Sequence, residues 1–254
     1  MLELSGRGAL IIGTRRLGQN LVHRLAQEGV NIAISYRSSK EQAERLSQTV
    51  EDIVERTHLM QGDLSVEEDV KRMVDETKTE LGDLSFVVNL ASNFLRTPFE
   101  TLDEESWDNS ILDAKGNYLL AVHAARCMVD NNGPTRGHII FFSDWAARET
   151  PYRDYLPYLT SKSAIDFMTR AFAVELAHQG ILVNAIAPGP TIRPPEIEET
   201  EWDLAIQQST PLRRESSKKD IVELIVTMLK SETITGETIR VDSGRHLTGP
   251  GAYG

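Results

Sequence analysis

The chain has 254 residues, a formal net charge of −11 and one cysteine, which excludes an internal disulfide. Its length is sufficient for one large α/β domain with a substantial core. The acidic balance argues against a nucleic-acid partner, because such binding depends mainly on clustered Lys and Arg. The N-terminus lacks a signal-peptide pattern and no apolar run is long enough to span a bilayer, so we expect a cytoplasmic protein that does not contact membranes.

Short apolar runs alternate with longer amphipathic stretches along the chain. The runs are rich in β-branched and aromatic residues and are uninterrupted, which is typical of buried strands. The predicted strands are residues 8–12, 31–35, 57–61, 85–89, 138–142, 182–186 and 238–241. The helical patterns between them include residues 18–29, 39–53 and 66–81. This alternation predicts an α/β fold with a parallel sheet of about seven strands and helices on both faces.

A glycine-bearing turn follows the first predicted strand and opens the first helix. Its sequence is GTRRLG, with Gly13 and Gly18 at its ends and Arg15, Arg16 and Leu17 between them. Backbone N–H groups at such a helix start, together with the helix dipole, can hold a pyrophosphate. Two glycines alone are a weak signal, but the strand before them, the helix after them and the two arginines favour a dinucleotide site.

The end of the second predicted strand indicates which dinucleotide binds. This strand ends with Tyr36, Arg37 and Ser38, and no acidic residue occurs before Glu41. An NAD site usually offers a carboxylate to the ribose here, whereas the 2′-phosphate of NADP requires cationic and hydroxyl donors. We therefore predict NADP(H) as the cofactor. The alternative is that Arg37 is an ordinary solvated arginine.

The third and fourth predicted strands also end in small polar residues. Asp63 and Leu64 follow the third strand, and Asp63 could accept a hydrogen bond from the adenine amino group. Asn89, Ala91 and Ser92 lie at the carboxyl end of the fourth strand, beside the expected ligand crevice. Either group could equally be ordinary loop capping.

Tyr158 and Lys162 lie near the start of a helical pattern at residues 156–178 and share one helix face. An ammonium group near a phenol favours the phenolate, so we expect Lys162 to lower the pKa of Tyr158 toward the operating pH and suit it to acid–base chemistry. Ser143 and Asp144 follow the fifth predicted strand, and either could assist the tyrosine.

The most irregular part of the chain is residues 187–214, which contain five of the ten prolines. One short helix is predicted within it, at about residues 199–208. The segment follows the sixth predicted strand, where a long loop is well placed to cover a ligand. We therefore predict a substrate-covering loop at about residues 190–212.

Together these motifs resemble the short-chain dehydrogenase/reductase family over essentially the whole chain. The glycine turn, GDLS, VNLAS, the Tyr-x-x-x-Lys pair, NAIAPG and ITGETIRVDSG occur in the family's order. The resemblance implies a single Rossmann-type, doubly wound domain over residues 1–254, with hydride transfer to or from nicotinamide and no metal. Tyr158 would then transfer the proton and Lys162 would hold the nicotinamide ribose. The implied cofactor contacts extend to Pro188, Gly189 and Ile192.

The chain departs from the usual family pattern at three places. Its glycine turn is one residue short, and Arg16 stands where the middle glycine belongs. Asp113 is the best match to the family's asparagine, so it is either a catalytic residue or a surface acid without a role. The usual serine position is ambiguous, because counting along the chain leads to Asp144 or Trp145.

A subgroup of the family shares these departures. Pteridine reductases and dihydromonapterin reductases carry an Arg-Arg-Leu-Gly-like turn, an aspartate in place of the serine, and an Ala-Ser-x-Phe sequence after the fourth strand. The corresponding residues here are RRLG at 15–18, Asp144 and ASNF at 91–94, and the tail GRHLTG at 244–249 is also similar.

This resemblance implies an NADPH-dependent reductase of a pterin or dihydropterin. Phe94 would stack on the pterin ring, and Arg16 and Ser92 would bond its polar edge or the cofactor phosphates. Asp144 and Tyr158 would deliver the proton, with Asp144 acting either as a donor or as an orienting group. By family resemblance we also expect a homotetramer formed through helices at 104–130 and 157–178.

Other interpretations remain open at this point. Phe94 could line an apolar pocket of another kind, and Asp144 could cap its loop while Ser143 assists Tyr158. The protein could then be a general carbonyl or 3-oxoacyl reductase. A catalytically silent NADP(H)-binding regulator is a further alternative, because the glycine turn is shortened and the usual serine and asparagine are missing.

Overall fold

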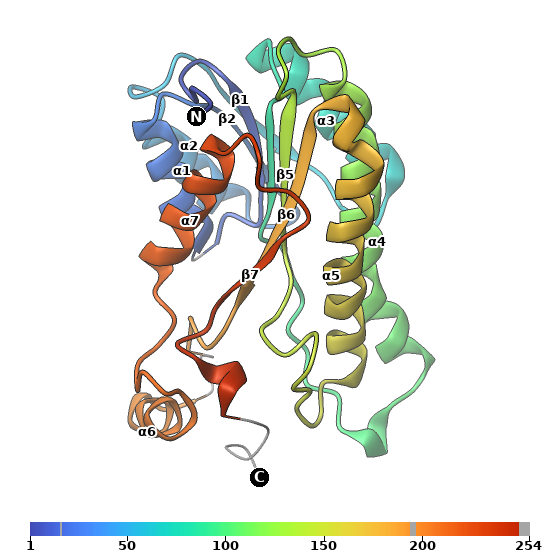
Figure 1. Ribbon diagram of the computed structural model, residues 1–254, viewed down its shortest axis with the longest axis vertical. Helices are drawn as coiled ribbons and strands as arrows, with labels where there is room; N and C mark the ends of the chain where they lie inside the picture. Colours follow the sequence, from blue (N-terminus) through green and yellow to red (C-terminus); the bar gives the residue numbers. More distant parts are fainter. Residues whose placement is uncertain (16, 194–196, 249–254) are drawn as a thin grey trace.

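A seven-stranded parallel sheet forms the centre of the computed structural model, which describes residues 1–15, 17–193 and 197–248 (Figure 1). The spatial order is β3-β2-β1-β4-β5-β6-β7. Every neighbouring pair is parallel, as predicted. The strand order reverses between β1 and β4, which is where ligands bind in open α/β sheets. The strands are β1 (Gly8–Ile12), β2 (Asn31–Tyr36), β3 (Thr57–Gln61), β4 (Phe86–Asn89), β5 (Gly137–Phe142), β6 (Ile181–Pro188) and β7 (Thr238–Val241).

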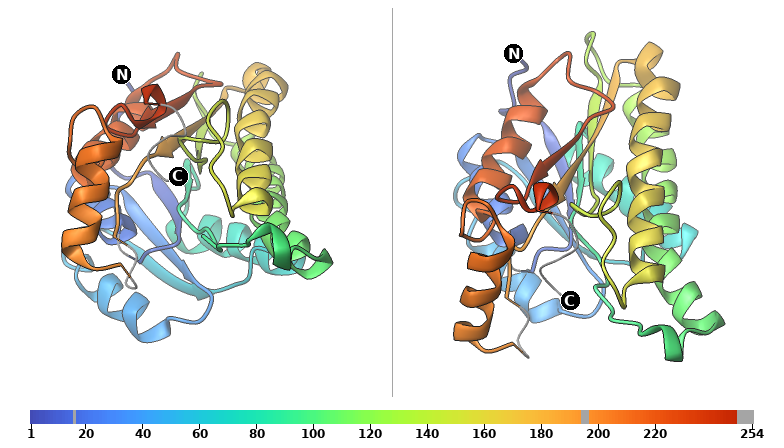
Figure 2. Two further views of the ribbon diagram at one scale, coloured as in Figure 1. Left: turned by 90° about the horizontal axis from the view of Figure 1, so that it is seen from below. Right: turned by 60° about the horizontal axis from the view of Figure 1, so that its bottom comes forward.

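Helices cover both faces of this sheet (Figure 1). One face carries α1 (Leu17–Gln27), α2 (Lys40–Gln48) and α7 (Lys218–Lys230), and the other carries α3 (Glu67–Leu81), α4 (Glu104–Met128) and α5 (Leu156–Leu176). A further helix, α6 (Glu199–Ser209), lies beyond the carboxyl ends of the strands (Figure 2). Short 3-10 helices span Phe99–Thr101, Ala177–Gln179 and Arg245–Leu247. The chain therefore has the predicted Rossmann-type, doubly wound fold.

Two apolar layers form the core, one on each face of the sheet. Successive strand residues point to opposite faces, so Ile11 packs toward α1 and α7 while Leu10 packs toward α3 and α4. Both side chains are completely buried. Burial on both faces explains why the strands read as uninterrupted apolar runs in the sequence.

One predicted helix is shorter in the structure than expected. The pattern at residues 39–53 predicted a helix to Ile53, but α2 ends at Gln48. The Thr49 hydroxyl donates to the carbonyl of Leu46 (2.6 Å), and the following residue, Val50, is completely buried under a turn. Ile53, the last residue of the predicted helix, is half exposed. The predicted short helix near 199–208 is confirmed as α6.

His138 on β5 is a completely buried histidine, and neither of its ring nitrogens has a hydrogen-bond partner among the described residues. Its ring lies 5.9 Å from that of Phe86. Burial, assisted by the positive charge of Arg7, lowers the pKa of His138 from 6.5 to about 4. The folded protein therefore holds this histidine neutral at pH values where the unfolded chain protonates it.

We expect the free energy of unfolding to fall by about 2 kcal/mol between pH 7 and pH 5 because of His138, since the unfolded state binds more protons in this range. His138→Leu is expected to remove this part of the acid sensitivity. Urea unfolding at both pH values would measure it, with His178→Leu as a control at an exposed histidine. Equal acid sensitivity in His138→Leu and the wild type would contradict the prediction.

Candidate active site

The carboxyl ends of β1, β4, β5 and β6 meet the start of α5 at one end of the sheet (Figure 2). Tyr158 and Lys162 lie in the first two turns of α5, which begins with Pro157 near its first position, a favoured site for proline. Both side chains are buried, with Lys162 only 1% exposed. The Lys162 ammonium donates to the carbonyl of Phe142 (2.9 Å) and lies 5.7 Å from the centre of the Tyr158 ring.

Asp144, rather than Ser143, contacts the tyrosine. The Tyr158 hydroxyl donates to Oδ2 of Asp144 (3.0 Å), and the Ala146 N–H donates to Oδ1 (2.8 Å). The Ser143 hydroxyl instead donates to the backbone carbonyl of Lys162 (3.1 Å). The structure thus brings Asp144, Tyr158 and Lys162 together and engages Ser143 with the helix backbone.

The buried carboxyl and phenol both have raised pKa values. Burial raises the pKa of Asp144, although hydrogen bonds from Ala146 and Tyr158 partly offset it. Burial, followed by the charge of Asp144, raises the pKa of Tyr158 well above its ordinary value. Burial also lowers the pKa of Lys162. The expectation that Lys162 lowers the Tyr158 pKa was therefore wrong for this arrangement, because burial and Asp144 outweigh the ammonium, and Tyr158 retains its proton.

Asp113 on α4 holds the loop after β4. Its Oδ2 accepts from the Ser92 hydroxyl and from the Asn93 N–H, both at 2.9 Å. Its backbone carbonyl accepts from the Asn117 amide (2.7 Å), and Asn117 in turn accepts from the Asn89 amide (3.0 Å). The sequence interpretation missed Asn117, although a polar residue one helical turn after Asp113 was a usable signal.

Aromatic rings surround Tyr158. Phe94 is 52% exposed, stacks on Tyr155 with ring centres 4.6 Å apart, and meets the edge of Tyr158 at 5.0 Å. Tyr152 stacks on Trp145 at 5.8 Å. Phe94 therefore lies beside Tyr158, with half of its side chain exposed. Trp145, Tyr152 and Tyr155 were not predicted as site residues, because nothing in their spacing shows how the loop folds.

The glycine turn packs closely against the end of β4. Gly13 has a φ of +81°, and a Cβ added there would lie 2.4 Å from the Ala91 backbone nitrogen. A Cβ at Gly18 would lie 2.6 Å from the Gly13 carbonyl oxygen, directly after Leu17 opens α1. Both positions therefore require glycine. Arg16 lies outside the described residues.

The predicted contacts for the adenosine half of the cofactor lie around the ends of β2 and β3. Tyr36 is the last residue of β2, and Arg37 and Ser38 beyond it are exposed. Asp63 accepts from the N–H and the hydroxyl of Ser65 (2.9 and 2.8 Å), and its pKa is lowered chiefly by the first of these bonds. Asp63 thus caps its own loop, as the alternative interpretation anticipated.

Two further residues predicted to contact the cofactor pack against neighbouring loops and helices. The Arg15 guanidinium hydrogen-bonds the hydroxyl of Ser39, which connects the glycine turn to the start of α2. Leu64 packs closely against Gly116 of α4. The first contact joins the loops after β1 and β2, and the second joins the loop after β3 to α4.

The loop after β6 starts on the side of the site opposite the loops after β1, β2 and β3. Pro188 ends β6, Gly189 packs against Asp242 so closely that a Cβ would lie 2.6 Å from it, and Ile192 is half buried. The chain then leads to α6, whose end is held by the buried Arg245, a residue that the sequence interpretation missed. Its guanidinium donates to the Ser209 carbonyl (2.9 Å).

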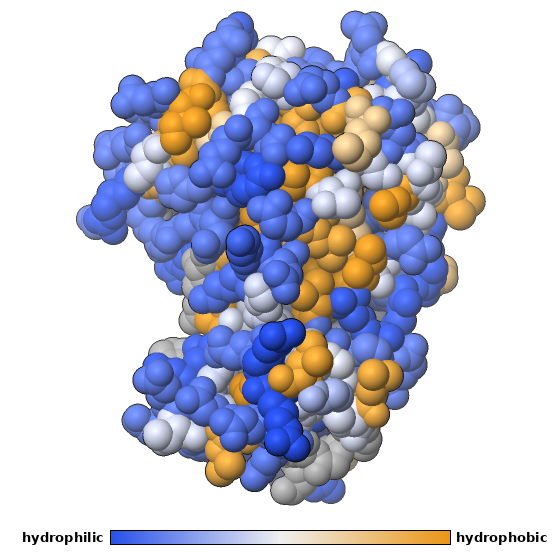
Figure 3. All heavy atoms as spheres, turned by 60° about the vertical axis from the view of Figure 1, so that its left-hand side comes forward, coloured by the Kyte–Doolittle hydropathy of each residue, from blue (hydrophilic) through white to orange (hydrophobic). Residues whose placement is uncertain are grey.

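A polar hollow separates α6 from the start of α7. Its volume is about 650 Å³, and its lining includes Thr191, Gln207, Arg214 and Lys218. Figure 3 shows that the surface on this side of the molecule is mostly hydrophilic. Residues of the predicted substrate-covering segment thus form one side of this hollow.

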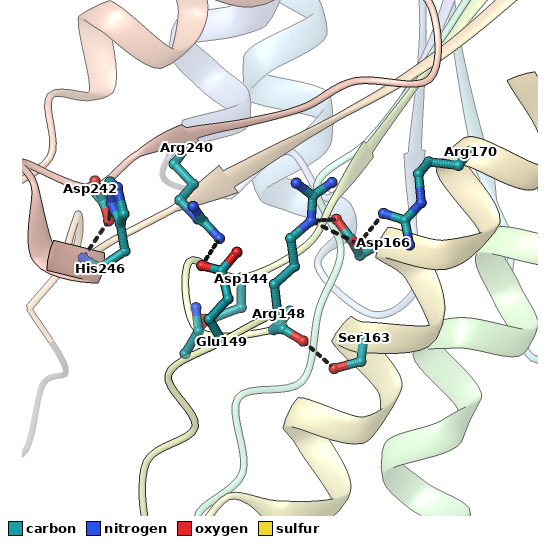
Figure 4. Close-up of polar contacts among 11 residues, drawn as sticks. Asp144, Arg148, Glu149, Ser163, Asp166, Arg170, Arg240, Asp242 and His246 are labelled. Carbon is teal, nitrogen blue, oxygen red and sulfur yellow. Dashed lines mark hydrogen bonds and ion pairs between the residues drawn. The ribbon is translucent and has the colours of Figure 1, made fainter. Parts of the chain in front are cut away.

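Ion pairs anchor the segment that carries Asp144 (Figure 4). The Arg148 Nε donates to both carboxylate oxygens of Asp166 on α5 (2.9 and 3.0 Å), and Arg170 donates to the same group (2.6 Å). Burial alone would raise the pKa of Asp166, but these two arginines bring it below its ordinary value. Glu149 pairs with Arg240 of β7 (2.5 Å). Both sides of the loop after Asp144 are thereby fixed to regular structure.

The described residues contain neither a membrane-spanning helix nor a metal-binding cluster. In residues 1–15, 17–193 and 197–248, no helix combines the length and the apolar character needed to cross a membrane. The same part of the chain contains no group of three or more His, Cys, Asp or Glu residues arranged to hold a metal ion.

Comparison with known proteins identifies the family. Residues 12–246 match the family described as enoyl-(acyl carrier protein) reductase. The hydroxynaphthalene reductase-like protein Arp2 of Metarhizium brunneum is 27% identical, over 95% of this chain and 96% of that protein. The short-chain dehydrogenase/reductase from Serratia marcescens is similar in structure, with 26% identity and a TM-score of 0.87 over 96% of this chain and 100% of that one.

A further solved structure is FolM alternative dihydrofolate reductase 1 from Brucella suis, in complex with NADP. It is 28% identical with a TM-score of 0.87, over 96% of each chain. The family match covers nearly the whole chain, and the strand order and the Tyr158–Lys162 pair agree with it. The chain therefore belongs to the short-chain dehydrogenase/reductase family.

Proposed function

We propose that this protein is an NADPH-dependent reductase of a pterin or dihydropterin. The observation that carries the proposal is the hydrogen bond between Asp144 and Tyr158 (3.0 Å), with the exposed ring of Phe94 beside it. The pteridine reductase subgroup combines an aspartate in place of the family's serine with an aromatic side chain that stacks on the substrate. The similarity to the Brucella suis dihydrofolate reductase supports it, because dihydrofolate contains a dihydropterin ring.

The residues around the glycine turn fit a bound NADP(H). Gly13 and Gly18 allow the turn before α1 to pack closely, and the N–H groups at the start of α1 would then hold a pyrophosphate. Arg37 and Ser38 are exposed at the end of β2, and they would receive the 2′-phosphate. The NADP complex of the Brucella suis relative supports this choice of cofactor. Lys162 would hold the nicotinamide ribose, and bound NADPH supplies the hydride.

Further contacts to the cofactor are proposed from the surrounding loops. Asn89 and Ala91 would border the cofactor at the end of β4, next to the turn at Gly13. On the other side, Pro188 and Gly189 end β6, and Ile192 follows them at the start of the segment leading to α6. We propose that this segment, with α6, covers the bound substrate.

Tyr158 and Asp144 would deliver the proton that accompanies the hydride. The raised pKa of Tyr158 keeps the phenol protonated until negative charge develops on the substrate atom beside it. Asp144 accepts the hydrogen bond from the Tyr158 hydroxyl and so orients the phenol, while burial raises the pKa of the carboxyl. Lys162 stabilises the phenolate that remains after donation through its nearby positive charge.

Phe94 and Ser92 would bind the substrate. The exposed face of Phe94 offers a flat apolar surface on which a pterin ring can stack. Asp113 fixes the Ser92 hydroxyl and the Asn93 backbone, and so holds this loop in place. We therefore propose that Asp113 acts by positioning the loop, rather than by exchanging a proton with the substrate.

We further propose that two copies associate through α4 and α5, as in the homotetramers common in the family. Tyr118 on α4 and Phe167 and Val174 on α5 are large apolar side chains that are at least half exposed. Covering them would remove apolar surface from water and so favour association.

The proposed function is tested by turnover of NADPH with a panel of acceptors. Biopterin, dihydrobiopterin, dihydromonapterin and dihydrofolate would be compared with simple ketones and 3-oxoacyl thioesters. We expect turnover of at least one pterin with kcat/KM well above that of any ketone. Turnover of ketones alone would favour a general carbonyl reductase, which the similarity to a hydroxynaphthalene reductase-like protein supports. Tight NADPH binding without any turnover would favour the silent regulator.

A further inference from the structure

Asp144 accepts a hydrogen bond from a second tyrosine hydroxyl, that of Tyr152, as well as from Tyr158. The Tyr152 hydroxyl lies 3.4 Å from Oδ2, the same oxygen that accepts from Tyr158 at 3.0 Å. The other oxygen, Oδ1, accepts from the Ala146 N–H at 2.8 Å. One buried carboxyl group therefore has a backbone donor on one oxygen and two phenols on the other.

The Tyr152 ring is held by its neighbours. It stacks on Trp145 with ring centres 5.8 Å apart and planes 21° apart, and it meets the edge of Tyr155 at 5.1 Å. Trp145 in turn lies under the guanidinium of the buried Arg245, 5.0 Å away. A ring packed in this way loses little further freedom when its hydroxyl points at Asp144.

We propose that Tyr152 is a positioning residue that keeps Asp144 in place while Tyr158 acts on the substrate. When the Tyr158 hydroxyl turns toward a developing negative charge, Oδ2 loses its nearer donor. A buried carboxyl oxygen without a donor is costly, and Tyr152 supplies one that does not react. This inference rests on the proposed function only in that Asp144 assists Tyr158.

The same contact contributes to the acidity of Asp144, in addition to burial and the bonds from Ala146 and Tyr158. The charged and titratable groups around it are Tyr152 and Tyr158, which hydrogen-bond it, and the Lys162 ammonium, whose charge acts on it. Asp113 acts on the same tyrosine and lysine from α4. Burial raises the pKa of Asp144 and the Tyr152 hydrogen bond lowers it, so removing this hydroxyl raises the pKa further.

Tyr152→Phe keeps the ring and removes only the hydroxyl. We expect the pH midpoint of kcat that reflects Asp144 to move upward, whether Asp144 acts protonated or ionised, because its pKa rises in both cases. We expect kcat to fall by about three- to tenfold, while KM for NADPH stays unchanged. Thr227→Val removes an exposed hydroxyl from α7, on the other face of the sheet from α4 and α5, and is the control.

A double-mutant cycle tests whether Tyr152 acts through Asp144. In an Asp144→Ala background, Tyr152→Phe is expected to have no further effect on kcat. An equal loss in both backgrounds, or an unchanged pH profile in Tyr152→Phe, would overturn the inference.

The pKa of Asp144 can also be followed without any substrate. Titration of the aspartate carboxyl carbons by NMR would assign Asp144 by comparison with Asp144→Asn, and Tyr152→Phe is expected to move its midpoint upward. If this shift occurs in a protein that turns over no pterin, the proposed substrate is wrong and the role of Tyr152 stands. If pterins are reduced and the midpoint does not move, the proposed function stands and the role of Tyr152 is wrong.

Discussion

Asp144→Ala is expected to lower kcat by roughly 100-fold or more, close to the loss in Tyr158→Phe, because a positioned proton donor contributes about this much. The carboxyl is the group that bonds the Tyr158 hydroxyl, and its removal leaves the phenol without this partner. Initial rates at saturating NADPH, with the acceptor that turns over best, would measure the effect. NADPH binding by fluorescence would confirm that the variant retains its cofactor site.

Ser143→Ala is the matched control at the neighbouring position. Its hydroxyl donates to the Lys162 backbone carbonyl, so its removal is expected to cost about 1 kcal/mol of stability and to change kcat by less than about threefold. The opposite result, a large loss in Ser143→Ala and a small one in Asp144→Ala, would place this protein with reductases that use a serine beside the tyrosine.

Gly13→Ala is expected to abolish tight NADPH binding and to destabilise the fold by about 3 kcal/mol. The added Cβ would lie 2.4 Å from the Ala91 backbone nitrogen. Backbone atoms at the end of β4 cannot move aside as a flexible side chain could. The turn must then move away from the sheet, together with the N–H groups that would hold the pyrophosphate. Urea unfolding and NADPH titration would measure the two effects.

Gly6→Ala separates the steric effect from the backbone effect. Gly6 has a similar φ of +76°, but nothing lies within 4 Å of an added Cβ. This variant is expected to lose only about 1 kcal/mol, from the left-handed backbone, and to bind NADPH normally. Equal losses of stability and of affinity in both variants would show that the contact between Gly13 and Ala91 is unimportant.

Much of the fold could be predicted from the sequence because each strand is buried on both faces. Such strands appear as short apolar runs, and the alternation of runs and helical patterns determines a parallel sheet. The end of α2 was not predictable in the same way. Periodicity extended the helix to Ile53, whereas burial of Val50 beneath a turn ends it at Gln48.

The site residues predicted from the sequence were those at which the chain departs from the usual pattern of its family. Asp144 bonds the Tyr158 hydroxyl, and Phe94, which was predicted to stack on the substrate, lies beside the same tyrosine. Tyr152 and Arg245 were missed, because their contacts depend on how the loop after β5 and the end of the chain fold over one another. The pKa of Tyr158 was predicted in the wrong direction, since sequence spacing shows the neighbouring ammonium but not the depth of burial.

The helix α4 contacts the candidate site on one side and is exposed at the molecular surface on the other. Asp113 and Asn117 on its inner side hold the loop that carries Ser92 and the end of β4, and the next residue, Tyr118, is half exposed on the outer side. Because a helix moves as a rigid rod, a rotation caused by packing at Tyr118 would also turn Asp113. Contacts on the outer surface and the shape of the substrate site are therefore mechanically linked through a single turn of helix.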